Sequence, residues 1–340
     1  MHFERVAVIG SDYISVSIAL GLKAHKEPPE IVGYDTKAVM ADLARTRGAF
    51  DRVERKPGRA CRDADLVIVS VPLTAIRDTF TAIAPHLRPG CLVTDTACLK
   101  APVMRWAEEL LPKEVFFASG RPVLKPAAAG PEPPEGLDDA SADLLTDALY
   151  CFTTSPGASG EVIAALTELA QALEAHPFFI DVAEHDGLQA GVEGLPDLLA
   201  IALLRATVDT PGWQEMRKFA GYRFAAATEA IGDADETHER NTAIFLNREN
   251  IVRRLDVLLT ELVYLRDLLT QDDAEPLEET FAAAAEGRAR WLRERGRGEW
   301  GRGAIARMDD IPSPGAQIRR MLFGERPARR EKEAARPRTK

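Results

Sequence analysis

The sequence predicts an α/β fold in which a doubly wound parallel sheet is followed by an all-helical domain. Buried aliphatic strands alternate with amphipathic helices as far as residue 183, the pattern of a parallel sheet covered on both faces. Beyond that residue the periodicity is helical and no convincing strand follows. We therefore expect a sheet domain at residues 1–183, a helical domain at 184–285, and an Arg-rich extension with a basic tail at 286–340.

The elements of the first domain follow one another in a regular order. Strands are predicted for RVAVIG, EIVGYD, ADLVIVSVP, GCLVTD, EVFFAS, YCFTTS and FFIDV. Helices are predicted between them, in SVSIALGLKAH, KAVMADLARTRG, TAIRDTFTAIAPHL, APVMRWAEELL and GEVIAALTELAQALEAH. Residues 124–140 are rich in Pro and Gly, which indicates a surface loop.

The second domain is predicted from three helical segments, LPDLLAIALLRATV, FAGYRFAAATEAIG and NTAIFLNRENIVRRLDVLLTELVYLRDLL. In the last segment an apolar stripe recurs at spacings of four and three, the pattern that seats one helix against others. The stripe consists of Ile251, Leu255, Leu258, Leu262, Leu265 and Leu269. It fits either the core of this domain or the seam of a dimer.

Composition excludes several classes of function. The net charge of -10 argues against nucleic acid as the main partner, and the basic tail favours a solvated segment over a contact with an acidic partner. No apolar run approaches the length of a membrane helix, and the first residues lack the basic-then-apolar pattern of a signal peptide. We therefore expect a cytoplasmic protein with no membrane partner. The four cysteines have no metal-ligand spacing, so we expect reduced thiols and no metal site.

Residues 6–15, VAVIGSDYIS, are similar to the turn of a dinucleotide site. Gly10 stands at the first glycine position of that fingerprint, whereas Asp12 and Ser15 replace the second and third glycines. Asp12 adds a negative charge beside the expected diphosphate. Asp35 ends the second strand, where a carboxylate favours NAD over NADP, and Lys37 weakens that preference. The alternative is an ordinary turn glycine and a helix cap.

The order of segments resembles the prephenate and arogenate dehydrogenases of tyrosine biosynthesis, in which a helical dimerisation domain follows a Rossmann domain. The resemblance runs from Val6 to Leu269. It is carried by VAVIGSDYISVSIALGLK, IVGYD, ADLVIVSVP, APHLRPGCLVTDTACLKAPV, SGRPV, EHD at 184–186, GLPDLLAIAL and LNRENI. It implies an oxidoreductase that oxidatively decarboxylates a small carboxylate substrate with NAD(P), as a homodimer joined through the helical domain.

The same resemblance implies which residues contact the cofactor, NAD with NADP as the alternative. These residues are Gly10, Tyr13, Ile14, Asp35, Val71, Pro72 and Asp95. The two lost glycines predict that this binding is weakened or lost.

The family's two catalytic positions are both substituted. The histidine of its G-H-P segment corresponds to Arg121, which stays protonated and cannot accept a proton from the substrate hydroxyl. The serine of its D-x-G-S-x-K segment corresponds to Cys98, whose thiol is a weak hydrogen-bonding group. His185 and Asp186 are kept, and a cap or packing role is the simpler interpretation for them.

The positions expected to bind substrate are changed as well. Lys100 is kept, but the family's H-L-P-H segment is GLPD here, with Gly194 and Asp197 in place of two histidines. Its F-R-D-x-T-R segment aligns with FAAATE, where both arginines are lost and Arg223 is the nearest cation. The candidates for substrate binding are therefore Lys100, Asp197 and Arg223.

Three functions remain open from the sequence. The first is a prephenate or arogenate dehydrogenase that works through altered residues, and family descent favours it. The second is a non-catalytic relative, a pseudoenzyme that binds a metabolite, nucleotide or protein with Arg121 as an anion anchor, and the changed site favours it. The third is a dehydrogenase for a different carboxylate substrate. Whether the chain is an active enzyme is not decided by fold-level kinship.

Overall fold

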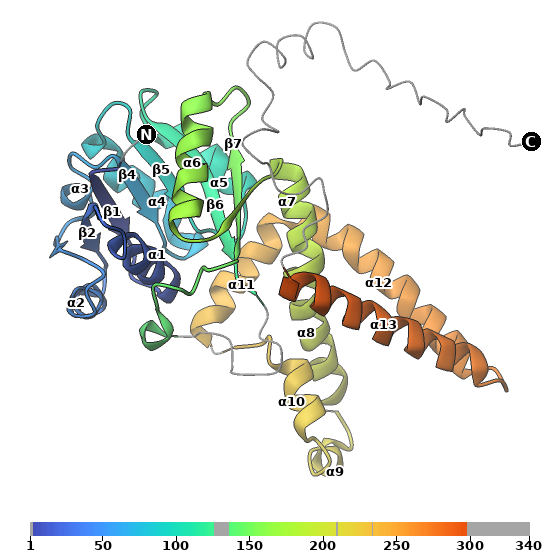
Figure 1. Cartoon of the computed structure of the whole chain (residues 1–340). Coiled ribbons are helices and arrows are strands. Elements are labelled where there is room, and N and C mark those ends of the chain that lie inside the picture. The colour runs from blue at the N-terminus through green and yellow to red at the C-terminus, as the bar shows by residue number, and fades with distance from the viewer. Residues whose placement is uncertain (1–2, 126–135, 209, 233, 298–340) are drawn as a thin grey trace, which may run out of the picture. The chain divides into compact units, whose positions relative to one another are not determined.

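An eight-stranded, mostly parallel sheet forms the first part of the protein (Figure 1). The computed structural model describes residues 3–125, 136–208, 210–232 and 234–297, all within one compact unit, Met1–Ile305. The strand order is β3-β2-β1-β4-β5-β6-β7-β8. The strands are β1 (Arg5–Ile9), β2 (Glu30–Tyr34), β3 (Arg52–Val53), β4 (Leu66–Val69), β5 (Leu92–Asp95), β6 (Phe116–Val123), β7 (Leu149–Thr154) and β8 (His176–Phe179).

The sheet confirms the predicted doubly wound class and differs from the prediction in two details. Strand β7 runs antiparallel to β6, with Arg121 opposite Cys151, whereas all other neighbouring strands are parallel. A parallel connection needs a crossover helix, and the described part of the β6–β7 connection contains only one 3₁₀ turn, Leu137–Asp139. Strand β3 has two residues, too few to produce a strand pattern in the sequence.

Helices cover both faces of the sheet and bury a separate core on each (Figure 1). Those of the first part are α1 (Tyr13–Lys23), α2 (Ala38–Thr46), α3 (Pro57–Ala60), α4 (Leu73–Ile83), α5 (Ala101–Leu110) and α6 (Gly160–Ala172). Residues of α1, α2 and α6 pack in one core, and residues of α3, α4 and α5 pack in the other. The central strand β4, LVIV, is buried along its whole length because both faces are covered.

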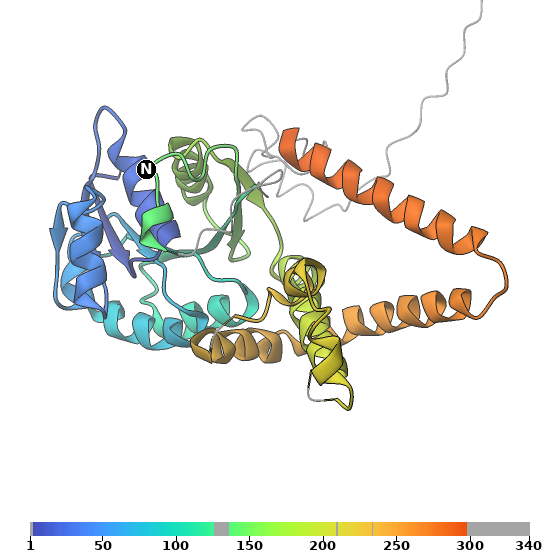
Figure 2. The same cartoon turned by 90° about the horizontal axis from the view of Figure 1, so that it is seen from below.

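The second part of the chain is helical, as predicted. Its helices are α7 (Val182–Gln189), α8 (Leu195–Thr207), α9 (Trp213–Met216), α10 (Tyr222–Thr228), α11 (Ala234–Leu246), α12 (Arg248–Leu269) and α13 (Glu275–Arg297). Figure 2 shows α12 leading away from the sheet and α13 returning toward it. At the end of α13, Arg295 donates hydrogen bonds to the carbonyls of Val123 and Leu124, both at 2.8 Å. The expected boundary at residue 285 lies inside α13, and the basic tail lies outside the described residues.

A π-helical segment, Ala190–Gly194, joins α7 to α8 and makes one helical run from Val182 to Thr207. This corrects the expectation that no apolar stretch approaches the length of a membrane helix: the run has 26 residues and is apolar enough to cross one. Glycines and a proline made the two helices look separate in the sequence. One such helix is weak evidence for a membrane span, and His185 and Asp186 near its start are buried against the sheet domain.

The apolar stripe of α12 is only partly covered within the chain. Ile251 is buried, Leu255, Leu258 and Leu265 are half-buried, and Leu262 and Leu269 are 46% and 69% exposed. Other large apolar side chains of α12 are also exposed, namely Val252, Val257, Leu259, Val263 and Tyr264. Much of the predicted stripe therefore does not belong to a core formed by the described residues of one chain.

Candidate functional site

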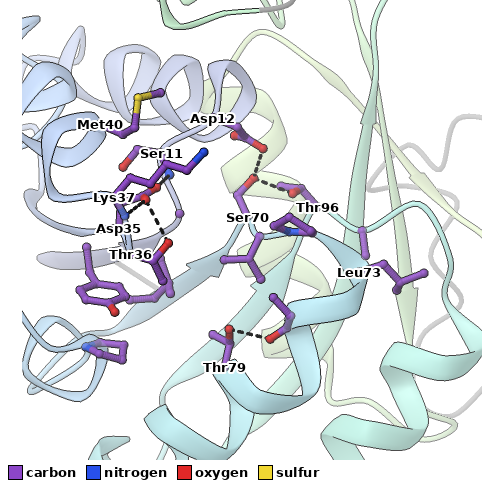
Figure 3. Close-up of a pocket in the computed structure, with 18 of the residues that line it drawn as sticks. Ser11, Asp12, Asp35, Thr36, Lys37, Met40, Ser70, Leu73, Thr79 and Thr96 are labelled. Atoms are coloured by element: carbon purple, nitrogen blue, oxygen red, sulfur yellow. Dashed lines mark hydrogen bonds between the residues drawn. The ribbon is translucent and has the colours of Figure 1, made fainter. Parts of the chain in front are cut away.

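A cavity of about 800 Å³, here named the large cavity, lies at the carboxyl ends of β1, β2, β4 and β5 (Figure 3). It opens where the chain leaves β1 for one face of the sheet and leaves β4 for the other. Such a switch point is where open α/β sheets bind ligands. The size of the large cavity is within the range of small-molecule sites.

The turn after β1 requires glycine at residue 10. Gly10 has a φ of +99°, and a Cβ built on it would lie 1.8 Å from the carbonyl oxygen of Ser70 at the end of β4. Its amide donates to the carbonyl of Tyr34 at 2.8 Å, so the turn is fixed between the two neighbouring strands. Gly10 thus brings the backbone to the floor of the large cavity, as the first glycine of a dinucleotide turn does.

Side-chain hydrogen bonds at the two lost glycine positions hold the same turn. Asp12 caps α1 by accepting the Ser15 amide at 2.7 Å and the Ser70 hydroxyl at 2.8 Å. Ser15 is fully buried, and its hydroxyl donates to the Gly10 carbonyl at 3.0 Å. The strand-turn-helix geometry is therefore kept without the second and third glycines.

The Asp12 carboxylate occupies the start of α1, where an anion is stabilised by the helix dipole. Its side chain is exposed to the large cavity, and the surrounding turn partly desolvates its carboxylate. This desolvation raises the pKa of Asp12. The hydrogen bonds from Ser15 and Ser70 lower that pKa by a smaller amount, and the charge of Asp35 adds to the rise. A cofactor diphosphate at this helix would meet a carboxylate that holds its proton more tightly than usual.

Asp35 lies directly after β2 and lines the large cavity. Its carboxylate accepts the Ser11 amide and the Lys37 amide, both at 2.7 Å. Asp35 thus both supports the first turn and remains at the position where a ribose hydroxyl would bind.

The structure places five of the seven predicted cofactor residues together. Gly10, Tyr13, Asp35, Val71 and Pro72 all line the large cavity. The other two lie behind it: Ile14 packs against the core of the α1 face, and Asp95 is fully buried at the end of β5. The backbone and the acid at the end of β2 fit a dinucleotide such as NAD, while Asp12 is the group that opposes its diphosphate.

A second hollow of about 120 Å³, here named the small cavity, lies next to the large one. Both are lined by Cys98 and Glu239, so they meet at these two side chains. The small cavity is otherwise formed by the helical part, through Gln189, Ala190, Glu193, Gly194, Asp197, Arg240, Ala243, Ile244, Asn247 and Ile251, together with Leu99.

Arg121 lies on β6 beside the small cavity. Its side chain is 17% exposed, and Nη2 donates a hydrogen bond to the carboxylate of Glu193. The other terminal nitrogen, Nη1, is buried and has no partner among the described residues. Burial raises the pKa of the nearby Cys98 thiol; the charge of Arg121 opposes this rise and that of Glu193 adds to it.

Lys100 is fully buried below the site. Its Nζ donates to the carbonyls of Ala97 and Gly120, at 3.0 and 2.7 Å, and lies 3.6 Å from the carboxylate of Asp95. Burial lowers the pKa of Lys100, and the charge of Asp95 opposes that effect. These contacts hold the loop between β5 and α5, and Lys100 does not line either cavity.

Asp186 joins the helical part to this loop. Its carboxylate accepts the amides of Lys100 at 2.8 Å and Ala101 at 2.9 Å, at the start of α5. The Nδ1 of His185 lies 2.8 Å from the same carboxylate. Burial lowers the pKa of His185, and the hydrogen bond to Asp186 opposes that effect. The pair acts as a buried helix cap in this structure.

The remaining substrate candidates lie apart from each other. Asp197 lines the small cavity and pairs with Arg240 at 3.1 Å. Arg223 is exposed on α10 and lines a different surface hollow, with Trp213 and Tyr222. The structure therefore brings Cys98 and Asp197 to the small cavity and places Arg121 behind its wall, paired with Glu193, while Arg223 and Lys100 lie outside the group.

Sequence reasoning missed three charged residues at the small cavity: Glu193, Glu239 and Arg240. Glu239 accepts the Leu73 amide at 2.5 Å, the Thr74 amide at 3.3 Å and the Thr74 hydroxyl at 3.0 Å, and so caps α4 from the helical part. The one available signal was local: Glu193 and Asp197 flank the GLP segment with a separation of four, which places them on one helix face. Among the described residues, no group of three His, Cys, Asp or Glu is arranged to hold a metal ion.

Comparisons with known proteins agree with this architecture. Residues 18–178 match the family model of the prephenate dehydrogenase nucleotide-binding domain, and residues 181–283 match that of the prephenate dehydrogenase dimerization domain. A prephenate dehydrogenase of Lactococcus lactis is 27% identical over 281 residues, which cover 82% of this chain and 75% of that protein. A cyclohexadienyl dehydrogenase of Zymomonas mobilis is 25% identical over 84% of this chain and 95% of its own length.

Among solved structures, a prephenate dehydrogenase from A. aeolicus in complex with hydroxyphenyl propionate and NAD+ has a TM-score of 0.73, with 19% identity over 85% of this chain and 99% of that one. The arogenate dehydrogenase of Synechocystis has a TM-score of 0.68, with 21% identity over 84% of this chain and 99% of that one. These two likenesses show the fold. Because the two family models together cover most of the sequence, the chain belongs to the prephenate dehydrogenase family.

Proposed function

We propose that this protein is an NAD-dependent dehydrogenase that oxidatively decarboxylates prephenate or arogenate. One observation carries the proposal: the large cavity of the nucleotide-binding domain meets the small cavity of the helical part at Cys98 and Glu239. A cofactor in the first and a ring substrate in the second would touch at that junction, which is the arrangement that hydride transfer needs.

Four residues would hold the cofactor. The turn at Gly10 lets the diphosphate approach the backbone, Asp35 accepts from the adenine ribose, and Val71 and Pro72 line the wall toward the small cavity. When bound, NAD accepts the hydride. We expect NAD to be preferred over NADP, because a 2'-phosphate would lie against the Asp35 carboxylate, with Lys37 as the nearest compensating cation.

Beside the small cavity, we assign the positive charge of Arg121 to attract the substrate carboxylate or hydroxyl oxygen. Arg121 lines neither cavity itself and is connected to the small one through its pair with Glu193. Cys98 contacts the reacting ring at the junction. Arg240 adds positive charge and is oriented by Asp197. In this proposal Lys100 positions the loop below the site and does not touch the substrate.

We propose that the protein works in the cytoplasm as a homodimer joined through residues 184–285 and the rest of α13. The match to a dimerization domain supports this, and so do the apolar side chains of α8 and α12 that one chain leaves exposed, including Leu199, Ile201 and Leu262. The same dimer contact would cover the apolar run Val182–Thr207.

A second candidate is a non-catalytic relative that binds NAD or a carboxylate without turnover. Arg121 favours it, because a guanidinium cannot take the proton that the family's histidine takes.

The test begins with calorimetric titration of NAD and NADP. NADH formation is then followed by absorbance with prephenate and with arogenate. We expect micromolar NAD affinity, weaker NADP affinity, and NADH release with one of the two substrates. NAD binding without NADH release from either substrate would favour the non-catalytic relative. The absence of binding by both nucleotides would overturn the proposed function.

A further inference from the structure

The family's proton acceptor is missing from β6, but a carboxylate stands beside the residue that replaces it. Arg121 pairs with Glu193, which the π-helical segment between α7 and α8 carries into the small cavity. We propose that Glu193 is the proton acceptor of the reaction and that Arg121 holds the substrate for it. This inference rests on the proposed function.

The local backbone holds Glu193 at this place. Gly194, the next residue, faces α12 so closely that a Cβ there would lie 2.1 Å from Ile251 Cδ1. One Glu193 oxygen accepts from Arg121 and the other from Gln189 Nε2, which fixes the carboxylate in the cavity wall. A π segment inside a helix is a recurrent feature of functional sites, because it redirects a side chain that regular α geometry would place elsewhere.

Glu193 also has access to the reacting atoms. Its side chain is 49% exposed, and it lines the same small cavity as Cys98, the residue shared with the large cavity. A general base must reach the proton that it removes, and the carboxylate of Glu193 meets this geometric condition in the wall of the small cavity.

The other candidates at the junction are less suitable. Glu239 accepts three hydrogen bonds at the start of α4, and Asp197 is paired with Arg240. His185 is buried against Asp186 and lines neither cavity. The Cys98 thiol has a raised pKa and stays protonated near neutral pH, so it does not accept a proton.

The proposed step conserves atoms and charge. As the ring carbon that bears the hydroxyl loses hydride to NAD+, the hydroxyl proton moves to a Glu193 carboxylate oxygen and a carbonyl forms. The bond from the ring to the carboxylate then breaks, carbon dioxide leaves, and its electron pair makes the ring aromatic. Glu193 returns the proton to the resulting phenolate oxygen, so no net proton is released.

The first test compares Glu193→Gln with Glu215→Gln, a control on exposed α9 that lines neither cavity. We expect kcat to fall at least about 100-fold in the first variant and to stay within twofold in the second, since general-base catalysis typically contributes 10²–10⁴-fold. Adding Arg121→His to Glu193→Gln should raise kcat at least tenfold above that of Glu193→Gln alone, because it supplies an imidazole at the family position. Thermal melting of every variant checks that the fold is intact.

The pH profile adds a readout that a structural role would not move. An imidazole acceptor, with an ordinary pKa of about 6.5, is largely protonated at about pH 5.5 and cannot take the substrate proton there. The double variant Arg121→His/Glu193→Gln should therefore lose activity below about pH 6.5, and the unchanged protein should not.

Binding supplies a readout that is independent of turnover. With NADH present, calorimetry compares 4-hydroxyphenylpyruvate with phenylpyruvate, which lacks the hydroxyl. The unchanged protein should prefer the phenol about tenfold, and Glu193→Gln should reduce that preference to within threefold. An unchanged preference and an unchanged kcat in Glu193→Gln would overturn the assignment while leaving the proposed function in place. Failure of the unchanged protein to bind either acid would overturn both.

Discussion

The large and the small cavity both lack side chains of the family pattern, but they are built in different ways. The large cavity is formed by backbone turns at the ends of neighbouring strands, and its lost glycines are replaced by Asp12 and Ser15, which hydrogen-bond within the same turn. The small cavity is formed by side chains from two parts of the chain, and Glu193 in its wall pairs with Arg121, which lies 72 residues away in the sequence. A backbone site keeps its shape when side chains change, whereas a side-chain site keeps its function only if another residue takes over the role.

The largest effect is expected for Gly10→Ala, which places a side chain in the backbone turn that forms the floor of the large cavity. The added Cβ would meet the Ser70 carbonyl at 1.8 Å on a residue with φ +99°. We expect NAD affinity to fall more than about 100-fold and the free energy of unfolding to fall by about 2–4 kcal/mol. Calorimetry and urea unfolding measure the two effects.

Gly48→Ala is the matched control, because Gly48 has φ +84° and no atom within 4 Å of a built Cβ. It should cost about 1 kcal/mol and leave NAD affinity unchanged. Equal losses in both variants would mean that backbone strain, and not the close approach to β4, explains the result.

Asp186→Ala tests the contact between the helical part and the loop before α5, which lies beside the small cavity. The change leaves the buried amide of Lys100 and the part-buried amide of Ala101 without their acceptor. We expect the free energy of unfolding to fall by about 2–4 kcal/mol, against about 1 kcal/mol for Asp181→Ala at the exposed cap of α7. Urea unfolding compares the two, and a smaller loss at Asp186 than at Asp181 would show that the buried contact adds nothing.

Asp12→Asn should increase the affinity of the large cavity for NAD. The neutral amide removes a negative charge beside the diphosphate, so NAD affinity at pH 7.5 should rise about three- to tenfold. Because desolvation raises the pKa of Asp12, the carboxylate costs the folded state nothing below its ordinary pKa of 3.8 and costs most above its raised value. The gain in affinity should therefore shrink as the pH falls toward that value.

Calorimetry at several pH values checks this trend, with Asp42→Asn outside both cavities as the control. Weaker NAD binding in Asp12→Asn would indicate that the cofactor uses the Asp12 carboxylate as an acceptor.

The smallest effect is expected for Ser15→Gly, which restores the third glycine of the fingerprint. The hydrogen bond to the Gly10 carbonyl is lost and a glycine enters α1, so stability should fall by about 1 kcal/mol. NAD affinity should stay within twofold, as titration will measure. A clear gain in affinity would mean that the missing glycine limits cofactor binding and that the turn is not equivalent without it.

Features that depend on interactions between neighbouring residues could be predicted from the sequence, and features that depend on contacts between distant residues could not. Strands, helices and the turn at Gly10 depend mainly on neighbouring residues, and most were confirmed. The exceptions are the direction of β7, the two-residue β3, the break between α11 and α12 at Asn247, and the course of α13 beyond residue 285. The roles of Glu193 and Glu239 depend on partners 72 and 166 residues away, and a single sequence contains no signal for such pairs. Lys100 shows the same limit: its match to a family position suggested a substrate contact, while its burial below the site depends on the packing of β5 and β6.

The cap that Glu239 places on α4 also gives a measurable signal of local opening in this protein. The amides of Leu73 and Thr74 belong to the first turn of a helix, so no carbonyl of that helix can protect them. Their protection from hydrogen exchange comes from one carboxylate of α11. The exchange rate at these two amides therefore measures how often the contact between Glu239 of α11 and the start of α4 opens.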